Sequence, residues 1–418
     1  MAIDHICKVE LCSGCGMCVQ LCKHSAIKMI SDIEGFLRPI VEPALCVDCG
    51  LCQKRCPANS PAFVNRNEPL KVFSGWSSDE EIRMASSSGG AFSEIAKYVI
   101  SKNGVVFGVA LDDKVQARHT YVEQEEDLCK LQGSKYVQSV IGNSYKEAEE
   151  FLRQGRLVLF SGTPCQIAGL YSYLHNDYEN LLTIDLICHG VPSPLVFEDY
   201  KKWIEDKIHE KVSDVKFRCK KSSWIFFSMG INSHTEKNKI TTYSYIGSYY
   251  ADPYIRAFLR DNILRPSCYS CQYASTKRVA DFTIADWWGY KATCPDDKDF
   301  ERKGVSLLMC NSRKALEIVH ELNMDLRERT LEEAIQTNRS LKQPFSLPPT
   351  RDRFWKDYDR LTFPEMIDKW MYPEKIALST YMRIYYPDNR IFIRVVNLYE
   401  RLMRKLRLIQ LIVKVQAK

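Results

Sequence analysis

The chain has 418 residues, which is enough for two or three domains of ordinary size. Hydrophobic residues make up 45% of it and charged residues 26%, a balance typical of a globular protein with a sizeable core. The net charge of +6 is modest for this length, and no long basic tract interleaved with aromatic residues occurs, so we expect no nucleic-acid partner.

Three features of the sequence indicate the cellular compartment of the protein: its N-terminal segment, its hydropathy pattern and its cysteines. Residues 1–11 carry charged side chains and lack the apolar stretch of a secretion signal. No run of about 18 apolar residues occurs, so we expect no membrane-spanning helix. The 17 cysteines are too tightly spaced for the disulfide scaffold of a short secreted chain. We therefore expect a cytoplasmic protein with thiolate-bound metal.

Nine of the cysteines fall between Cys7 and Cys56, and eight of these form two runs with the same spacing. The first run is Cys12, Cys15, Cys18 and Cys22, and the second is Cys46, Cys49, Cys52 and Cys56. This is the spacing of bacterial ferredoxins, in which three close thiolates hold one cubane and the fourth crosses to the other. The spacing therefore predicts two [4Fe–4S] clusters. Cluster 1 is expected on Cys12, Cys15, Cys18 and Cys56, and cluster 2 on Cys22, Cys46, Cys49 and Cys52.

A pair of structural zinc sites is the alternative, because zinc also accepts four thiolates. Zinc sites usually combine two short two-cysteine knuckles, whereas here two four-cysteine runs repeat one pattern, which favours the clusters. The first run departs from the ferredoxin pattern at Lys23, where proline is usual; this changes the turn after Cys22 but not the ligand. Cys7 lies outside both runs and is expected to be a packed or free thiol. We assign residues 1–60 to a ferredoxin domain.

The segment from Asn59 to Pro69 is rich in proline and asparagine and is expected to be a linker. After it, apolar stretches typical of buried strands alternate with helical patterns. We expect strands at 104–111, 156–162 and 181–187, and helices at 91–102, 145–154, 166–174 and 195–209. This alternation predicts an α/β domain with a mostly parallel sheet. The expected order is an α+β ferredoxin-like domain, the α/β domain in two parts at 70–190 and 191–350, and a helical basic tail at 351–418.

Two turns between an expected strand and an expected helix are rich in serine, threonine and glycine: Ser86–Gly90 and Ser161–Cys165. Bare backbone N–H groups at the positive end of a helix are suited to hold an anion. Ordinary helix capping by serine and threonine is the alternative. Because ligands of such sheets bind where strands end and helices begin, both interpretations stay open for these turns.

Cys165 and Cys188 each follow an expected strand, and Cys268 and Cys271 form a CxxC pair in a loop. Cysteines at the ends of parallel strands converge on one edge of a sheet, where a loop CxxC pair is suited to complete a four-thiolate site. A CxxC pair alone is equally typical of zinc sites and of thiol redox chemistry. The remaining cysteines lack partners at ligand spacing and are expected to be core or surface thiols: Cys129, Cys219, Cys294 and Cys310.

These motifs together resemble the coenzyme F420 hydrogenase/dehydrogenase beta-subunit family, in its bacterial form with an N-terminal two-cluster ferredoxin domain. Each motif alone is weak, and the combination is specific. Besides the cysteine runs, the motifs that carry the resemblance are SSSGGAF at Ser86–Phe92, GSKYVQS at Gly133–Ser139, SGTPCQIAGL at Ser161–Leu170, DLICHGVPSP at Asp185–Pro194, CYSC at Cys268–Cys271 and ADFTIADWWG at Ala280–Gly289. They run in order across most of residues 1–310.

The resemblance implies a flavin, usually FAD, on the α/β domain and a third [4Fe–4S] cluster beside it. By position, the ligands of that third cluster would be Cys165, Cys188, Cys268 and Cys271. The flavin and substrate pocket would be lined by Ser88, Gly89, Gly90, Lys135, Tyr136, Thr163, Pro164 and Asp286, with Trp287 shaping it. Use of the deazaflavin in the family name is not carried over, because similar chains are encoded among bacterial polysaccharide-synthesis genes.

The expected function is therefore that of an iron–sulfur flavoprotein oxidoreductase. Electrons would pass from a ferredoxin-like donor through the clusters to a flavin that reduces an unidentified small molecule, in polysaccharide synthesis. A flavin suits this place because it converts one-electron arrivals into a two-electron delivery. The alternative is an electron-transfer subunit of a larger hydrogenase- or dehydrogenase-type complex, with no substrate of its own.

Three further features are candidates for function. Lys135, beside Tyr136, either stabilises negative charge on reduced flavin or substrate or is an ordinary surface lysine. His189 is a candidate proton donor, although a lone histidine is more often structural. Residues 401–418 contain six Lys or Arg and no acid, which predicts either a membrane-surface helix or a helix packed on its own domain. The apolar face of that helix would consist of Leu402, Leu406, Ile409 and Val413.

Overall fold

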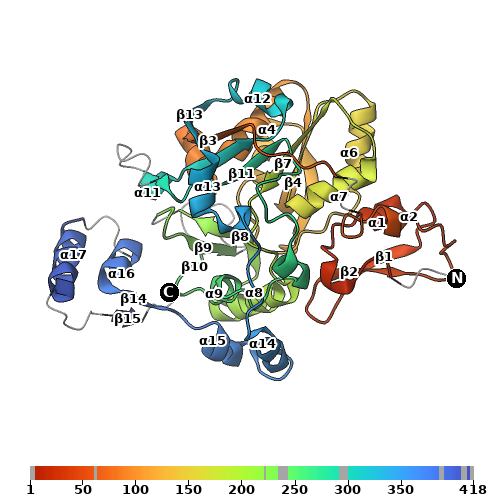
Figure 1. Cartoon of the computed structure of the whole chain (residues 1–418). Coiled ribbons are helices and arrows are strands. Elements are labelled where there is room, and N and C mark those ends of the chain that lie inside the picture. Colours follow the sequence, from red (N-terminus) through yellow and green to blue (C-terminus); the bar gives the residue numbers. More distant parts are fainter. Residues whose placement is uncertain are drawn as a thin grey trace.

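The computed structural model describes the chain at residues 5–60, 64–220, 223–233, 243–290, 300–385, 390–405 and 412–414. Figure 1 shows an N-terminal unit in red at one side, a central body built on a large sheet, and C-terminal helices in blue at the opposite side. Within these ranges, every helix is too short or too polar to cross a membrane.

The N-terminal unit is built around the two cysteine runs. Its elements are η1 (Val9–Leu11), α1 (Met17–Leu21), β1 (Ile27–Ser31), β2 (Leu37–Val41) and α2 (Leu51–Lys54). Strands β1 and β2 pair antiparallel. Each short helix starts inside a cysteine run, directly after a glycine in the left-handed region: Gly16 with φ 74° and Gly50 with φ 68°. Glycine adopts this conformation without steric cost, so the chain turns from a thiol-bearing loop straight into a helix.

The central body contains a sheet of eight strands in the order β13-β3-β12-β11-β7-β6-β4-β5. In chain order these are β3 (Lys71–Ser77), β4 (Val105–Leu111), β5 (Ala117–Val122), β6 (Val158–Gly162), β7 (Leu181–Leu186), β11 (Phe282–Asp286), β12 (Ser306–Cys310) and β13 (Met324–Arg329). Strands β4, β6 and β7 confirm the three that the sequence predicts. Strands from before and after residue 190 pair in one sheet, so both expected parts of the α/β domain build it.

The sheet is mixed, which corrects the expectation of a mostly parallel sheet. Its centre, β11-β7-β6-β4, is parallel. Strands β12, β3 and β13 on one side and β5 on the other are added antiparallel. A short turn suffices to join antiparallel neighbours such as β4 and β5, whereas parallel neighbours need a crossover such as α7 between β6 and β7.

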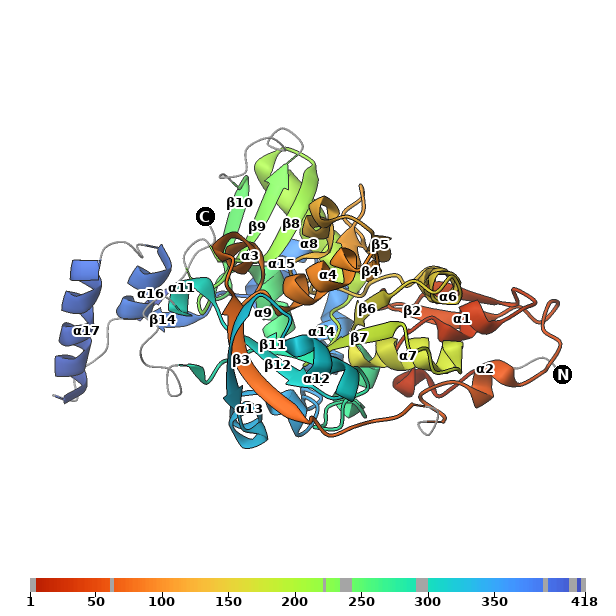
Figure 2. The same cartoon turned by 90° about the horizontal axis from the view of Figure 1, so that it is seen from above.

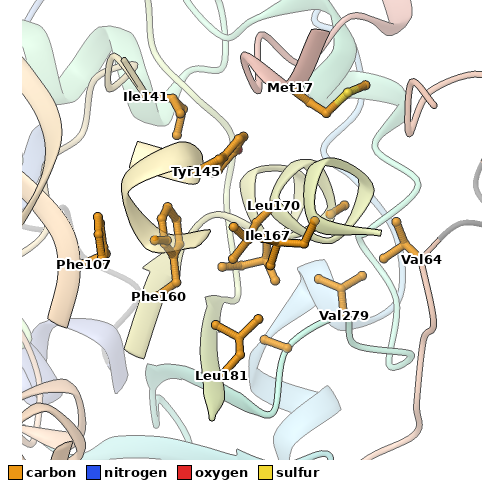
Figure 3. Packing of buried hydrophobic residues seen from close by; sticks show 14 of the residues in the cluster. Met17, Val64, Phe107, Ile141, Tyr145, Phe160, Ile167, Leu170, Leu181 and Val279 are labelled. Carbon is orange, nitrogen blue, oxygen red and sulfur yellow. The ribbon is translucent and has the colours of Figure 1, made fainter. Parts of the chain in front are cut away.

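Helices cover both faces of this sheet. The four predicted helices are confirmed as α4 (Ala91–Ser101), α6 (Ser144–Arg153), α7 (Pro164–Leu174) and α8 (Pro194–Ile208). Alternate residues of a strand face opposite sides. Phe107 and Phe160 therefore pack with α6, α7 and Met17 of the N-terminal unit (Figure 3). Val106 and Leu159 pack on the other face with α4 and with α12 (Arg313–Val319).

A second, three-stranded sheet of order β10-β9-β8 lies beside the large one (Figure 2). Its strands are β8 (Val212–Cys219), β9 (Ser228–Ser233) and β10 (Tyr245–Ser248). It shares an apolar core with α8 and with α9 (Pro253–Leu259), α14 (Arg351–Tyr358) and α15 (Phe363–Trp370). The short remaining elements of the body are α3 (Glu80–Ala85), η3 (Glu125–Asp127), α5 (Leu128–Leu131), η5 (Pro266–Ser270), α11 (Phe300–Lys303), α13 (Leu331–Thr337) and η6 (Arg339–Leu341).

The C-terminal region corrects the expectation of a helical tail that reaches Val413. It contains β14 (Lys375–Ala377), α16 (Leu378–Tyr385), α17 (Arg390–Lys405) and β15 (Ile412–Lys414). Strand β15 pairs antiparallel with β14, and Val413 lies opposite Ile376. The β-branched residues Ile412 and Val413 favour this extended conformation over a helix. Leu406 and Ile409 of the expected apolar face lie outside the described residues.

Candidate redox site

The thiols of Cys12, Cys15, Cys18 and Cys56 line one cavity of the N-terminal unit. Three of them come from the first cysteine run, and Cys56 comes from the end of the second run. Cys18 and Cys56 are buried, and the other two are half-buried. The structure thus gathers the crossed set that ferredoxin spacing predicts for cluster 1, and four thiol donors around a shielded cavity fit a cubane.

Cys7 lines the same cavity, which its position outside both runs did not indicate. Hydrogen bonding from Cys7 lowers the pKa of Cys12 to about 5 and the pKa of Cys56 to about 7. The same contacts, together with burial, raise the pKa of the Cys7 thiol. Cys7 is a packed thiol, as expected, but one that favours the thiolate form of two neighbours, and the thiolate is the form that binds metal.

The thiols expected for cluster 2 lie closer to solvent. Burial and then the charges of Cys49 and Cys22 raise the pKa of Cys52. Cys49 is exposed, Cys52 is buried, and Cys22 and Cys46 are half-buried. The apolar side chains of Leu45 and Val47 next to this set are 47% and 55% exposed. This face of the N-terminal unit therefore presents its thiol set and an apolar surface to the outside.

The third cysteine set joins residues far apart in the sequence. Cys165 lies in the first turn of α7, Cys188 follows β7, Cys268 lies in η5, and Cys271 follows η5. Burial raises the pKa of Cys188, and so do the charges of the other three thiols, because all four lie close together. Burial also raises the pKa of Cys268 to about 12. The set lies at the carboxyl ends of β6 and β7, as the strand-end argument predicts, and thiols buried in this way ionise when a metal supplies positive charge.

Within the described ranges, no three or more His, Cys, Asp or Glu side chains converge as they would around a single ion.

The first and third thiol sets meet where the N-terminal unit contacts α6 and α7. A Cβ placed on Gly169 of α7 would lie 3.1 Å from the Sγ of Cys15, so this helix packs directly on a thiol of the first set. The buried hydroxyl of Tyr145 on α6 donates to the carbonyl oxygens of both Cys15 and Gln166, at 2.9 Å each. One tyrosine thereby ties the loop of the first set to the helix that carries Cys165.

Arg265 is a residue of this junction that sequence reasoning missed. Its side chain is fully buried, and burial lowers the pKa of its guanidinium. The Nε donates to the carbonyl oxygen of Cys12 at 2.7 Å, and the NH2 lies 3.6 Å from the Sγ of Cys12. The two residues are 253 positions apart, so no local pattern points to the contact.

The first serine-glycine turn is held by contacts within the protein. The N–H of Gly89 donates to the Oγ of Ser306 at 2.9 Å, and the Oγ of Ser88 donates to the carbonyl oxygen of Val305 at 2.7 Å. A Cβ on Gly89 would lie 2.4 Å from the carbonyl oxygen of Gly75, so only glycine fits here. Gly90 precedes α4 with φ 105°. The N–H of Gly89 is therefore not free for an anion, and packing explains this glycine.

The second turn is a capped helix start. Thr163 is the N-cap of α7, forms a capping box with Gln166, and is followed by Pro164 in the first helical position. The N–H of Thr163 donates to the Oε1 of Gln166 at 2.9 Å, and its Oγ1 lies 3.2 Å from the Sγ of Cys165. Capping explains the composition of this turn, and the threonine also contacts a cysteine of the third set.

The loop of Lys135 and Tyr136 contacts the first turn, because the N–H of Ser134 donates to the Oγ of Ser87 at 2.8 Å. The Nζ of Lys135 donates to the carbonyl oxygen of Gln132 at 2.7 Å. Burial lowers the pKa of Lys135 to about 7. Lys135 is thus a partly enclosed amine that closes its own loop, and not a freely solvated surface lysine.

Asp286 ends β11 and forms an ion pair with the buried Arg218. Its second oxygen accepts a hydrogen bond from the Nε1 of Trp224 at 2.8 Å. The Cζ of Arg218 stands 5.4 Å from the ring of Trp288, and the charge of Arg218 acts on Tyr136. The Nε and NH2 of Arg218 are buried and make no hydrogen bond within the described chain. The expected pocket residues Tyr136 and Asp286 therefore meet at an arginine that the motifs did not reveal.

Two further residues lie in this region: Lys220, which no motif of the sequence singled out, and Trp287, which was expected to shape the pocket. Lys220 donates to the carbonyl oxygens of Ser88 and Lys303 at 2.5 and 2.6 Å, and burial lowers its pKa to about 7. Trp287 is fully buried in the core formed by β12 and its neighbours. Lys220 thus anchors the Ser86–Gly90 turn, and Trp287 supports the region by packing.

His189 has the surroundings of a structural histidine. Its Nε2 lies 2.6 Å from the Oδ1 of Asp261, and its ring packs 4.7 Å from Phe258 and 3.8 Å from Phe345. These contacts hold the loop that follows Cys188. They fit the structural alternative, and the role of His189 as a proton donor stays a prediction.

Three family profiles match the chain. The N-terminal and C-terminal profiles of the coenzyme F420 hydrogenase/dehydrogenase beta subunit match residues 72–144 and 155–334. The 4Fe-4S dicluster domain matches residues 11–60. No curated protein matches. A chain of the F420-reducing [NiFe] hydrogenase complex from Methanosarcina barkeri is similar at 15% identity over 67% of this chain and 90% of that chain, with a TM-score of 0.45.

The two beta-subunit profiles together cover more than half of the 418 residues, and the dicluster profile coincides with the two cysteine runs. The N-terminal domain is thus an iron–sulfur domain of the 4Fe-4S type, and its role is electron transfer. The chain belongs to the coenzyme F420 hydrogenase/dehydrogenase beta-subunit family.

Proposed function

We propose that the chain is an iron–sulfur flavoprotein oxidoreductase, which receives electrons singly from a ferredoxin-like donor and uses them to reduce a small molecule at a flavin. The observation that carries the proposal is the contact between the first and third thiol sets across α7. The ligands would be Cys12, Cys15, Cys18 and Cys56 for cluster 1, Cys22, Cys46, Cys49 and Cys52 for cluster 2, and Cys165, Cys188, Cys268 and Cys271 for cluster 3. Neighbouring thiol sets form a continuous route for single electrons into the central body.

The exposed face around Cys49 is the proposed entry point. Electron transfer between proteins needs a redox centre close to the surface, and weak redox complexes use small interfaces. The half-exposed Leu45 and Val47 supply an apolar contact area beside that centre. A donor that docks here would reach the second thiol set first, and the first and third sets lie farther in.

The proposed flavin region is the surroundings of Arg218. Two buried guanidinium donors of Arg218 without a partner in the described chain, in aromatic surroundings that include Tyr136 and Trp288, fit an acceptor-rich aromatic group. A bound flavin would supply the exchange between one-electron and two-electron chemistry. Asp286 holds Arg218 in place, and Lys220 holds the Ser86–Gly90 turn. The resemblance extends the proposal to a substrate in polysaccharide synthesis.

Anaerobic purification of the full chain followed by iron, sulfide, zinc and flavin analysis tests this function. We expect about twelve iron and twelve sulfide per chain, from three cubanes of four irons each, with FAD released on denaturation. Cys268→Ser should remove about four irons, whereas Cys129→Ser, at an exposed cysteine, should remove none. A colourless protein with bound zinc would refute the assignment.

Separate variants of the protein test the proposed flavin region. Arg218→Gln should lower the flavin content and leave the iron content unchanged. Arg351→Gln is the matched control, because Arg351 is also a buried arginine paired with a carboxylate, Glu34, but lies outside the proposed flavin region. Equal flavin loss in both variants would show that Arg218 acts through general stability and not at the flavin.

An electron-transfer subunit without a substrate of its own is the second candidate. The observation that favours it is the C-terminal helix α17, where Val395, Leu398 and Tyr399 are 56%, 62% and 43% exposed. Such an apolar face is suited to bind another subunit. Stable co-purification of a partner that holds the catalytic centre would decide for this function.

A further inference from the structure

Arg265 is a fully buried arginine at the junction between the N-terminal unit and the central body. Its backbone N–H donates to the carbonyl oxygen of Val191 at 2.9 Å, which fixes the start of η5. The side chain reaches into the N-terminal unit, where the Nε donates to Cys12 O at 2.7 Å and the NH2 to Leu37 O at 2.9 Å. The NH1 is buried and makes no hydrogen bond within the described residues.

Arg265 has no carboxylate within ion-pair distance in the part of the chain that the structure describes, whereas five other buried arginines do have one. Those pairs are Arg38–Asp32, Arg218–Asp286, Arg256–Glu374, Arg278–Asp185 and Arg351–Glu34. The ring of Phe36, 5.4 Å from the Cζ of Arg265, attracts the cation but carries no net charge. A buried cation without an anion is strongly disfavoured, so its counter-charge must come from another group.

Arg265 contacts cysteines of two thiol sets. Its guanidinium reaches the first set, because the NH2 is 3.6 Å from the Sγ of Cys12. Its backbone contacts the third set, because Cys268 follows in the same turn and donates its N–H to the carbonyl oxygen of Arg265 at 2.9 Å. The side chain of Arg265 therefore lies against the first thiol set, and its backbone belongs to the turn that carries Cys268.

We propose that Arg265 is the counter-ion of cluster 1, and that its charge draws electrons inward from cluster 2. The inference rests on the proposed function, because it needs clusters on these thiol sets. A cubane with four thiolates carries negative charge that grows by one on reduction, so a fixed cation at its side stabilises the reduced form. In this transfer one electron would leave the reduced cluster held at Cys49 and reduce the oxidised cluster held at Cys12, and no proton would move.

Two residues hold the guanidinium in this place. Gly14, between two cysteines of the first set, has φ +71°. A Cβ on it would lie 2.8 Å from the NH1 of Arg265 and 2.6 Å from the Nε2 of Gln138. The arginine, the glutamine and the cysteine loop are therefore in close contact. The Oε1 of Gln138 accepts from the N–H of Leu37 at 3.0 Å, which fixes the amide next to the NH1.

Redox titration of the full-length, anaerobically purified protein, followed by electron paramagnetic resonance, tests the proposal. Arg265→Gln keeps a hydrogen-bonding side chain and removes the charge. We expect the equilibrium constant for reduction of the centre nearest Cys12 to fall at least tenfold, which lowers its midpoint potential by about 59 mV for one electron. The midpoint potential of the exposed centre should stay unchanged. Arg265→Lys keeps the charge, so its midpoint should stay near the wild-type value although the guanidinium contacts are lost.

Gln138→Glu is a second variant that leaves Arg265 in place. It puts a carboxylate beside the unpaired NH1 and neutralises the cation locally, while one oxygen still accepts from Leu37. We expect the same downward shift as in Arg265→Gln. This variant keeps the test valid if Arg265→Gln assembles poorly.

Unchanged midpoints in both Arg265→Gln and Gln138→Glu, with normal iron content, would overturn the proposal and leave Arg265 as a structural link. An equal shift in Arg265→Lys and Arg265→Gln would also overturn it, because hydrogen bonding and not charge would then set the potential. A wild-type protein without iron would instead refute the proposed function, so the two failures are distinguishable.

Discussion

At the scale of single residues, burial changes the charge that residue type alone would indicate. Lys220 lies inside the protein, where its Nζ contacts backbone carbonyl oxygens and burial lowers its pKa to about 7. Cys12, in contrast, becomes more acidic because Cys7 hydrogen-bonds to it. A lysine that looks like a solvated charge thus anchors a turn, and a cysteine outside the ligand spacing tunes its neighbours.

His119 provides a test of burial at this scale. Its ring lies on β5, stacked 5.6 Å from Phe160, and burial lowers its pKa to about 4. An unfolded histidine titrates near pH 6.5, so between about pH 6.5 and 4 the unfolded state binds a proton that the folded state does not. The folded state is therefore destabilised as the pH falls through this window, by about 3 kcal/mol at its acid end.

His119→Gln removes the titrating ring. Its free energy of unfolding should fall less between about pH 7 and pH 5 than that of the wild type, whatever packing it loses at neutral pH. Urea denaturation followed by circular dichroism at several pH values measures how the free energy of unfolding changes with pH. Parallel profiles for the two proteins would show that burial of His119 does not contribute to the pH dependence.

At the scale of elements, α7 has three tasks. It crosses between the parallel strands β6 and β7, its first turn carries Cys165, and its Gly169 allows Cys15 to approach. The sequence predicted the helix from its apolar pattern and its cap. The close approach at Gly169 could not be predicted, because the partner lies in another domain.

Gly169→Ala tests that approach. In an open helix this change stabilises by about 1 kcal/mol. Here the new Cβ would lie 2.8 Å from the hydroxyl of Tyr145 and 3.0 Å from the Cβ of Cys15, so we expect destabilisation by about 1–3 kcal/mol and loss of iron from the first thiol set. Glu150→Ala on the exposed face of α6 is the control and should leave the iron content unchanged. A more stable variant with full iron content would contradict the packing argument.

At the scale of the whole molecule, the N-terminal unit is held to the central body by buried polar contacts. Glu34 forms an ion pair with Arg351 of α14, and the carbonyl oxygen of Glu34 accepts from the Oγ of Ser193 at 2.5 Å. The Oε1 of Gln20 accepts from the N–H of Tyr145 at 3.0 Å. The arrangement of the thiol sets therefore depends on how two domains dock.

The Glu34–Arg351 pair allows a charge swap. Glu34→Arg or Arg351→Glu alone leaves like charges buried at the interface and should cost about 3–5 kcal/mol. The double swap should recover part of that loss, since opposite charges again face each other. Thermal unfolding measures the three variants. The exposed pair Lys71–Glu328 is the matched control, where each single swap should cost about 0–1 kcal/mol.

Short-range patterns in the sequence by themselves determined the iron–sulfur domain, the strands β4, β6 and β7, and the helices α4, α6, α7 and α8. Ligand spacing and hydrophobic period are properties of windows of a few to about twenty residues, so they can be interpreted without a fold. The whole mixed sheet could not be predicted in this way, because two of its antiparallel pairs, β12–β3 and β13–β3, join strands more than 200 positions apart.

Only the tertiary structure decided which buried charges face which thiols. Arg265 and Cys12 are 253 positions apart, and neither position carries a pattern that points to the other. The cost of burying a charge depends on every group within a few ångströms, which long-range packing sets. The cysteine ligands of this chain can thus be predicted from short stretches of its sequence, whereas the electrostatic surroundings of these ligands form only when the domains dock.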